Sequence, residues 1–568
     1  MNKNGIAKKI LALALALVFV LAIAACGSKE TTSSGTTEKT ETTGTTEKTE
    51  TAGTTEKTEP APAATEAKAP ELSYWIKMDA TKISPTTDNF GTILCYQEMA
   101  KITGVNVTFI HPPAGQENDS FSLMLTGGEY PDLIHWDWGH VSGGPDKMIE
   151  EGVILDLAQI IDEKCPNLKA FLDEHPEIRA AMTTDDGHIY CFPNVYPYFE
   201  EDTIIVANRG YQVRQDWLKE LGLKEPETID DWYTMLKAFK EKGTAENGGE
   251  IVPMVSQQLS SKTSMIRTLA NAWGGLDYDF YVDNGVVKYG PTQPTFKDYL
   301  TTMNQWYNEG LINKDFSTID LKAVNAMITE GQAGAWFYGL GAGMGVYIKA
   351  FGDESKIEGV KFPVVNAGDT PKYTILDNYP FIGLGTAIST KCKDIDAACK
   401  WLDYHFSDEG RMLMNWGVQG VSYELDANGE PYFTDAVLHD PDGLSVDVAL
   451  GKYAMVSQLD AIAKDHRSEA LRMLTYDTQK EAAKVFNDAD FTYRYPPTAT
   501  MTAEESAEYA SIMSDINTYR DENLVRFIVG TEPLENFEKF VSQIEKMNIA
   551  RAIEIKQASY DRLQARMK

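Results

Sequence analysis

Aromatic and polar side chains that suit a sugar-like ligand gather in residues 135–140, HWDWGH. A sugar presents apolar CH faces and hydroxyl edges, so its site needs flat rings beside groups that donate and accept hydrogen bonds. Trp136, Asp137 and Trp138 are consecutive in this segment. If a strand continues through them, Trp136 and Trp138 lie on one side and Asp137 on the other. The segment therefore predicts a position that stacks on a ligand, with core packing of a tryptophan as the alternative.

Further candidate ligand-binding residues stand near glycine or proline in segments expected to be irregular, where backbone can approach a ligand. They are Tyr196, Tyr198, Arg209, Trp273, Trp336, Tyr338, Asp377, Tyr379 and Trp416. The aromatic rings are candidates for stacking, whereas Arg209 and Asp377 are candidates for hydrogen bonding. Core packing is the competing interpretation for each aromatic ring.

Residues of the kinds that catalyse reactions or bind metals are present but poorly arranged for either task. Glu200 and Glu201 could suggest the two carboxylates of a glycosidase, but neighbours on a strand point to opposite faces. His135 and His140 lack the helical spacing of a zinc pair. The glycine-rich residues 339–345, GLGAGMG, lack the lysine of a phosphate loop and are predicted to form a flexible turn. We therefore expect no catalysis, no cofactor and no metal; the alternative is a surface polysaccharide-processing enzyme.

The elements that must position these residues alternate between strand and helix from residue 71 onward. Strands are predicted over residues 72–78, 105–110 and 132–136. Between them, one helix is predicted over residues 89–103, and a second helix is predicted to end at residue 126. Such alternation is typical of an α/β fold with a largely parallel sheet, whose ligands bind at the carboxyl ends of the strands. The C-terminal third is predicted to be helical, over residues 468–486, 502–521, 535–547 and 551–567.

The N-terminus has the pattern of a targeting segment, which is excluded from the fold. Lys3, Lys8 and Lys9 precede the apolar residues 10–21, and small residues lead to Cys26. This pattern resembles the lipobox of bacterial lipoproteins, although an ordinary secretory signal is the alternative. The resemblance implies cleavage before Cys26 and a diacylglyceryl group on its thiol. Two acyl chains on one residue give stable membrane anchoring.

Residues 27–70 are predicted to be a disordered linker between the lipid anchor and the folded body. GTTEKTETT, GTTEKTETA and GTTEKTEPA repeat with a period of nine residues, and large apolar side chains are almost absent. Such a segment cannot bury enough apolar surface to offset its chain entropy. A flexible chain of this length reaches roughly 35–40 Å, enough to lift the body from a membrane.

Length, charge and cysteine content further restrict the domain organisation and the class of ligand. A chain of 568 residues is too long for one ordinary core, so we expect two or more lobes. The formal net charge of −32 argues against nucleic-acid binding, because phosphates would be repelled. No second segment is apolar over a length that spans a bilayer. Cys165 with Cys191, or Cys392 with Cys399, could form disulfides, but buried free thiols are our first expectation.

Four segments resemble an extracellular family in their order and spacing. They are LMLTGGEYPDLIHWD at 123–137, the stretch from RQDWLKELGL to FKEKG at 214–243, EGQAGAW at 330–336 and the long late region at 387–435. The chain after the linker resembles the sugar-binding lipoproteins of ABC importers, related to maltose-binding and alginate-binding proteins. Gly334 departs from the family motif by replacing its second alanine.

The resemblance implies two α/β lobes joined by a hinge, with the ligand between them. One lobe would comprise residues 71–200 plus 377–440, and the other residues 201–376 plus 441–568. The implied function is capture of a di- or oligosaccharide at the outer face of the cell membrane and delivery to ABC permease subunits. We expect a lipid-anchored monomer. A ligand sensor for a receptor kinase is a second alternative that the sequence leaves open.

Calcium is not expected, although some members of the resembled family carry an EF-hand-like loop. Residues 243–253, GTAENGGEIVP, stand at that place and lack the two leading aspartates. Calcium takes six to eight oxygen ligands, which this loop does not offer. Residues 426–430, DANGE, are predicted to form a hairpin turn instead.

Overall fold

The computed structural model describes residues 69–196, 206–374, 380–456 and 460–568. The predicted signal segment, most of the linker and five of the residues considered above (Tyr198, Glu200, Glu201, Asp377 and Tyr379) lie outside this part of the chain. The described residues build two separate hydrophobic cores, each with its own sheet.

The first core surrounds a sheet of six strands in the order β14-β4-β11-β3-β1-β2. The strands are β1 (Glu71–Trp75), β2 (Asn106–Ile110), β3 (Leu133–Asp137), β4 (Phe192–Val195), β11 (Phe381–Ile388) and β14 (Ile462–Ala463). β1, β2 and β3 are parallel, whereas β11 runs antiparallel to both of its neighbours, β3 and β4. The predicted succession of strand, helix, strand, helix and strand is therefore confirmed, with boundaries shifted by a few residues.

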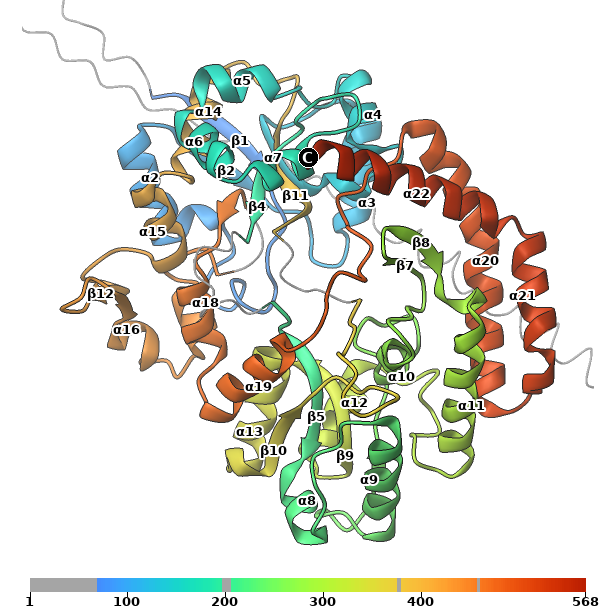
Figure 1. The fold of residues 1–568 in the computed structure, drawn as a ribbon. Coiled ribbons are helices and arrows are strands. Elements are labelled where there is room, and N and C mark those ends of the chain that lie inside the picture. The colour runs from blue at the N-terminus through green and yellow to red at the C-terminus, as the bar shows by residue number, and fades with distance from the viewer. Residues whose placement is uncertain (1–68, 197–205, 375–379, 457–459) are drawn as a thin grey trace, which may run out of the picture. The chain divides into compact units, whose positions relative to one another are not determined.

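The first lobe also contains helices, most of which lie around this sheet (Figure 1). They are α2 (Leu94–Thr103), α3 (Glu117–Gly127), α4 (Gly144–Glu150), α5 (Ala158–Lys164), α6 (Pro166–Glu174), α7 (Pro176–Met182), α14 (Ile395–Tyr404), α15 (Asp408–Trp416), α16 (Asp435–Leu438) and α17 (Val446–Leu450). α2 and α3 each end at a glycine, Gly104 and Gly128, in the left-handed conformation that closes a helix. β12 (Tyr423–Leu425) and β13 (Pro431–Phe433) form an antiparallel hairpin, so the predicted turn at residues 426–430 is confirmed.

The second core surrounds a four-stranded sheet in the order β10-β5-β9-β6. Its strands are β5 (Arg209–Arg214), β6 (Val252–Met254), β9 (Ala333–Gly339) and β10 (Ile357–Val360), and β7 (Phe280–Asp283) and β8 (Val286–Tyr289) form a separate hairpin. Helices α8 (Gln215–Leu221), α9 (Ile229–Glu241), α10 (Met265–Leu269), α11 (Pro294–Asn308), α12 (Leu321–Thr329) and α13 (Val346–Phe351) belong to it. α9 shows why such helices form here: Thr228 and Asp231 make a capping box, and Trp232, Leu236 and Phe239 share its buried face.

The C-terminal region is helical, as predicted, and completes the second core. It comprises α18 (His466–Met473), α19 (Asp477–Asn487), α20 (Ala503–Val529), α21 (Phe537–Lys546) and α22 (Ile549–Arg566). Ile516, Phe527 and Ala552 from these helices are buried in the second core. Figure 1 shows α20, α21 and α22 running beside one another, and α20 also packs against α11.

Two expectations from the sequence need correction. Residues 441–463 were assigned to the second lobe, but Leu450, Met455 and Ile462 are buried in the first core, and β14 belongs to the first sheet. The glycine-rich segment is not a flexible turn: Leu340–Gly345 forms a π-helical turn that leads into α13. Gln479 of α19 donates a hydrogen bond of 2.7 Å to the Leu340 carbonyl, which ties this turn to the C-terminal helices.

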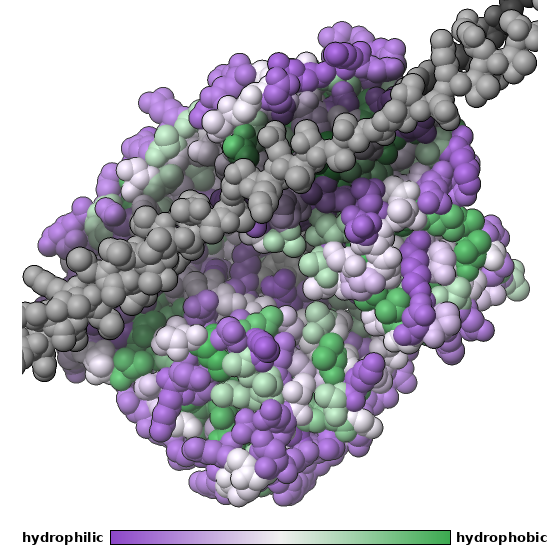
Figure 2. Space-filling model, turned by 180° about the vertical axis from the view of Figure 1, so that it is seen from behind, coloured by the Kyte–Doolittle hydropathy of each residue, from purple (hydrophilic) through white to green (hydrophobic). Residues whose placement is uncertain are grey.

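Hydrophilic side chains cover most of the face in Figure 2, and its apolar residues form separate patches rather than one band. No helix in the described part of the chain is both long and apolar enough to cross a bilayer.

Candidate functional site

The carboxyl ends of the first sheet's parallel strands lie along one edge. β4 is antiparallel to β11, as β3 is, so β1, β2, β3 and β4 all run in the same direction, and β14 is parallel to β4. β11 begins at this edge, where Phe381 pairs with Val195 and Leu384 with Asp137. The chain passes between the two cores three times: after β4, before β11 and after β14. Each of these crossings meets the first sheet at this same edge.

The second sheet presents its own carboxyl edge to the same crossings. β6 and β10 both run parallel to β9, so the three strands point toward the same edge, although β9 continues to Gly339, beyond the level of Met254 and Val360. Arg209, the first residue of β5 after the first crossing, pairs with Gly339. Because ligands of α/β sheets bind beyond the carboxyl ends of strands, the described residues at the two edges form the candidate ligand site.

Trp136 is the aromatic residue best placed at the first edge. It is half-buried near the end of β3, and its ring stacks on Phe121 with centroids 4.2 Å apart and an interplanar angle of 11°. Trp75 packs against the same indole at 5.4 Å. Two neighbouring rings fix the orientation of Trp136, while part of its surface remains available for contact.

Asp137 and Trp138 differ in what they can contribute. β3 ends at Asp137, whose Oδ1 lies 2.9 Å from Nδ1 of the exposed His140. Trp138 then begins a short 3₁₀ helix, is fully buried, and donates its indole N–H to the Gly385 carbonyl at 3.1 Å. Asp137 remains a candidate for a ligand contact, whereas Trp138 is a core residue.

The first crossing begins at Tyr196, which is 3% exposed and packs against His466 with ring centroids 6.1 Å apart. Beside it lies a group of charged residues that the sequence analysis did not select. Burial lowers the pKa of Lys464 to about 7, and Arg472 donates to Asp447 at 2.5 Å. Their signal in the sequence was a dense run of charges directly after a short apolar strand.

Arg209 and Tyr338 face the crossings from the second sheet. Both are half-buried, and Gly210, next to Arg209, pairs with Tyr338. Burial raises the pKa of Tyr338, and the positive charge of Arg209 opposes that rise. The charge of Arg209 therefore acts on the phenol of Tyr338 at the carboxyl end of β9.

Trp273 lies in a loop tied to the second crossing. It is half-buried and meets Tyr299 edge to face, with centroids 5.6 Å apart. Asn271, two residues earlier, accepts a hydrogen bond of 2.9 Å from the backbone of Thr374, the last described residue before that crossing. Trp273 therefore remains a candidate for stacking on a ligand.

Trp336 and Trp416 are core residues, as Trp138 is. Trp336 is 1% exposed and donates to Gln212 at 2.9 Å, and Trp416 is fully buried and donates to Asp465 at 2.9 Å. With their rings covered and their N–H groups satisfied, they are not available to a ligand in this structure. For these three tryptophans the packing interpretation replaces the expectation of ligand contact.

The histidines considered for metal binding have separate partners. His135 is buried, with Nδ1 3.1 Å from the Thr386 hydroxyl, whereas His140 contacts Asp137. Across the described ranges, no three His, Cys, Asp or Glu side chains are grouped so that they could hold a metal ion. At the loop of residues 243–253, Glu246 instead forms ion pairs with Arg214 and Lys356.

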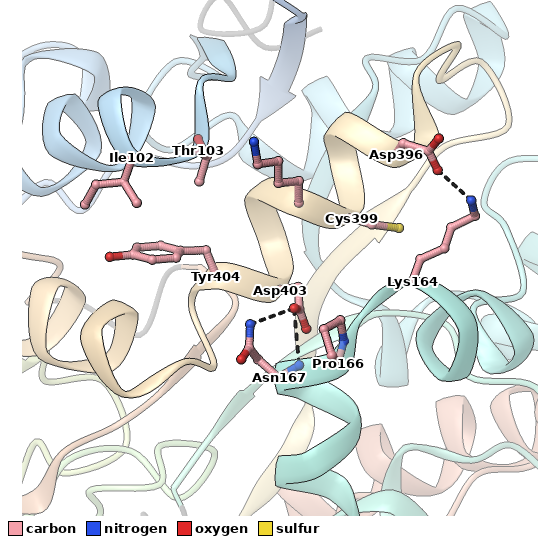
Figure 3. Close-up of a pocket in the computed structure, with 10 residues that line it drawn as sticks. Ile102, Thr103, Lys164, Pro166, Asn167, Asp396, Cys399, Asp403 and Tyr404 are labelled. Carbon is pink, nitrogen blue, oxygen red and sulfur yellow. Dashed lines mark hydrogen bonds and ion pairs between the residues drawn. The ribbon is translucent and has the colours of Figure 1, made fainter.

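A pocket of about 450 Å³ opens on the first lobe, away from this edge (Figure 3). Its walls come from α2, α5, α6 and α14, and Thr103 lies just before the amino end of β2. Lys164 and Asp396 form an ion pair of 2.6 Å across it, and Asp403 accepts a hydrogen bond of 2.8 Å from the Asn167 side chain. The pocket is therefore distinct from the candidate ligand site.

Two α/β lobes whose carboxyl edges adjoin shared crossings define a two-lobed binding protein, and the predicted fold class is confirmed. Residues 88–412, more than half of the chain, match the family described as bacterial extracellular solute-binding protein, and the chain belongs to this family.

Its relatives include two curated proteins. The chain is 26% identical to the fructooligosaccharide ABC transporter substrate-binding protein FusA of Streptococcus pneumoniae, over 86% of this chain and 89% of that protein. It is 26% identical to lipoprotein LipO of Bacillus subtilis, over 79% of this chain and 85% of that protein.

Solved structures show the same fold. The crystal structure of the alginate-binding protein AlgQ2 without calcium ion matches with a TM-score of 0.67 and 26% identity, covering 87% of this chain and 98% of that chain. A solute-binding protein from Bifidobacterium longum infantis, described as associated with an HMO-binding ABC transporter, matches with a TM-score of 0.71 at 18% identity, over 87% of this chain and 99% of that chain.

Proposed function

We propose that this protein captures an oligosaccharide outside the cell and delivers it to the permease of an ABC importer, without chemical change to the ligand. The observation that carries the proposal is the convergence of both carboxyl edges on the three crossings. Two lobes joined in this way can close over a ligand by hinge motion. The relative FusA, named for fructooligosaccharides, supports a carbohydrate as the ligand class.

The side chains at the two edges have the chemistry that a carbohydrate needs. Trp136, Trp273 and Tyr338 are half-buried rings, so each is oriented by the protein and still offers surface for stacking. Asp137 and Arg209 supply an acceptor and a donor for hydroxyl groups. Closure of the lobes would bring groups from both edges onto one ligand.

Calorimetry combined with product analysis tests this function. The purified mature protein is titrated with panels of fructooligosaccharides, α-glucans, β-glucans and uronic-acid oligomers. We expect saturable heat with one panel and recovery of the ligand unchanged in length. Shortened products would support the polysaccharide-processing alternative. A peptide panel is titrated in parallel, and heat with peptides alone would refute the carbohydrate assignment.

We further propose that a lipid on Cys26 holds the protein at the outer face of the cell membrane. The targeting pattern supports this proposal, together with the relative LipO, which is named a lipoprotein. Cys26→Ala should release the protein from the membrane fraction into the medium. Incorporation of labelled palmitate should be lost in this variant and retained in Cys392→Ala.

A further inference from the structure

Cys165 and Cys399 are brought together in the first lobe, although the sequence suggested other pairs. The five cysteines of the described ranges are thiols, and all five are buried. Cys165 and Cys399 lie on elements that pack together, close enough for each thiol to influence the ionisation of the other. Neither of the pairs considered from the sequence, Cys165 with Cys191 or Cys392 with Cys399, makes this contact. The structure therefore contains one dithiol pair, joined across 234 residues of chain.

Contacts on both sides hold the two cysteines in register. Cys165 joins α5 to α6, and Cys399 lies in the middle of α14, which packs against both helices. One residue before Cys165, Lys164 pairs with Asp396 at 2.6 Å. Just after it, the backbone N–H of Leu168 donates to Asp403 at 2.8 Å. These two contacts bracket the thiols and hold the helices that carry them against each other.

Both thiols are buried, but only one of them reaches the pocket of Figure 3. Cys399, 1% exposed, lines the pocket beside Lys164, whereas Cys165, 0% exposed, is not among the lining residues. The hydrogen bond from Cys165 and the nearby Lys164 ammonium lower the pKa of the Cys399 thiol, which favours its reactive thiolate. A small disulfide molecule entering the pocket would therefore meet Cys399 first.

We propose that Cys165 and Cys399 form a disulfide when the protein meets a small oxidised disulfide, with Cys399 as the attacking thiol and Cys165 as the resolving thiol. The Cys399 thiolate attacks one sulfur of the small disulfide, whose S–S bond breaks and releases one thiolate. The thiolate released in the first step takes the proton of Cys165, whose sulfur then attacks the Cys399 sulfur and displaces the second thiolate. That thiolate takes a proton from water, which balances the proton lost when Cys399 ionised. The protein is oxidised by two electrons, and the small disulfide is reduced to two thiols.

Peptide mapping tests the bond directly. The mature protein is reduced, freed of reductant, exposed to oxidised glutathione, alkylated and cut with trypsin. We expect a linked pair of peptides, CPNLK at 165–169 and DIDAACK at 394–400, with a mass about 2 Da below their sum. Recovery of both peptides in alkylated form only, or linkage of either cysteine to a different one, would overturn the proposal.

Single variants test the order of attack. Cys165→Ala should accumulate glutathione on Cys399, because the resolving thiol is gone. Cys399→Ala should leave Cys165 free of glutathione, because Cys165 does not line the pocket. Cys392→Ala is the matched control and should give the linked peptides as the parent does. Modification of Cys165 in the Cys399→Ala variant would contradict the assigned roles.

Thermal unfolding supplies an independent measurement. A disulfide that closes a long loop stabilises the fold mainly by restricting the unfolded chain, so oxidation should raise Tm by about 5 °C. This rise should be present in Cys392→Ala and absent from the two pair variants, each of which is first shown to be folded by circular dichroism. A rise that persists in Cys399→Ala would contradict the proposal.

Discussion

Trp136 stacks on Phe121 with ring centroids 4.2 Å apart, and this contact orients the indole at the carboxyl end of β3. The stacked pair joins α3 to the sheet edge from which all three crossings leave. An aromatic ring held in this way loses little conformational freedom when a ligand stacks on it. The relationship makes Trp136 the most direct test of the proposed binding edge.

Trp136→Ala should weaken oligosaccharide binding by about 10- to 100-fold, since truncation of a central aromatic contact costs about 1.4–2.8 kcal/mol. Calorimetry with the ligand found in the panel screen gives the two dissociation constants. Phe at the same position should recover part of the affinity because it retains a flat ring. Unchanged affinity in Trp136→Ala would remove Trp136 from the site.

Trp138→Phe is the matched control, two residues along the chain. Trp138 is fully buried and donates to the Gly385 carbonyl, so this variant leaves a buried acceptor without its donor. We expect a loss of about 1–3 kcal/mol in the free energy of unfolding with ligand affinity nearly unchanged. Denaturant titration and calorimetry separate the two effects.

The strands and helices near the N-terminus of the body were predictable because local signals agree with the tertiary structure. Glycines at 104 and 128 end helices in the left-handed conformation, and the short apolar run before Asp137 forms β3. The last departure of the chain from the first core was misplaced at residue 440, whereas the structure places it after β14. β14 contains only Ile462 and Ala463, too short a run to produce a recognisable pattern.

Burial of individual aromatic residues could not be predicted from spacing alone. Trp136 and Trp138 flank the same residue, Asp137, yet one is half-buried and the other fully buried, because the strand ends between them at Asp137. The contact of Cys165 with Cys399 likewise arises from the packing of α14 on α5 and α6. Such outcomes depend on tertiary contacts that the local pattern does not encode.

We expect the stability of the protein to be independent of calcium, because the Glu246 carboxylate is paired with Arg214. The Arg214 side chain is fully buried, donates to Asp216 and to Glu246, and stacks on Trp217 at 4.6 Å. Glu246 therefore links residues 243–253 to β5 without a metal. Addition of calcium or of EDTA should leave Tm unchanged in a thermal-shift assay; a calcium-dependent rise would contradict the prediction.

Glu246→Ala should lower the free energy of unfolding by about 1–2 kcal/mol, because the buried guanidinium loses one of its two acidic partners. The partial exposure of Glu246 keeps the expected loss at the lower end of the range for buried pairs. Glu250→Ala, in the same loop, is the control because Glu250 is likewise exposed but is not one of the two ion-pair partners described for Arg214. Equal losses in the two variants would show that the loop, and not the Arg214 contact, determines stability.

Asp185 links the first lobe to the C-terminal helix. It lies in the turn after α7 and accepts hydrogen bonds from Arg562 and Arg566 of α22. Asp185→Ala should cost about 2 kcal/mol and broaden or split the calorimetric unfolding peak, since a charged contact between the two lobes is lost. The neighbouring Asp186 is exposed, so Asp186→Ala should leave the peak unchanged. A single unshifted peak in Asp185→Ala would show that other contacts couple the lobes.

Two histidines should give opposite dependences of stability on pH. Burial lowers the pKa of His135 from 6.5 to about 3, so below pH 6.5 the unfolded chain binds a proton that the folded protein excludes. The free energy of unfolding should therefore fall as pH decreases from 6.5, by about 1.4 kcal/mol per pH unit for this one group. His135→Asn should lose that contribution while retaining a polar contact with Thr386.

His188 provides the matched control with the opposite sign. The hydrogen bond with Asp146, at 2.9 Å, raises the pKa of His188 above 6.5, so the folded protein holds this proton more tightly than the unfolded chain. Its contribution is complete below pH 6.5 and is lost as pH rises through the raised pKa. Denaturant titrations from pH 5 to pH 8 should show a shallower acid loss in His135→Asn and lower stability near pH 5 in His188→Asn. Parallel pH profiles for the two variants would contradict both assignments.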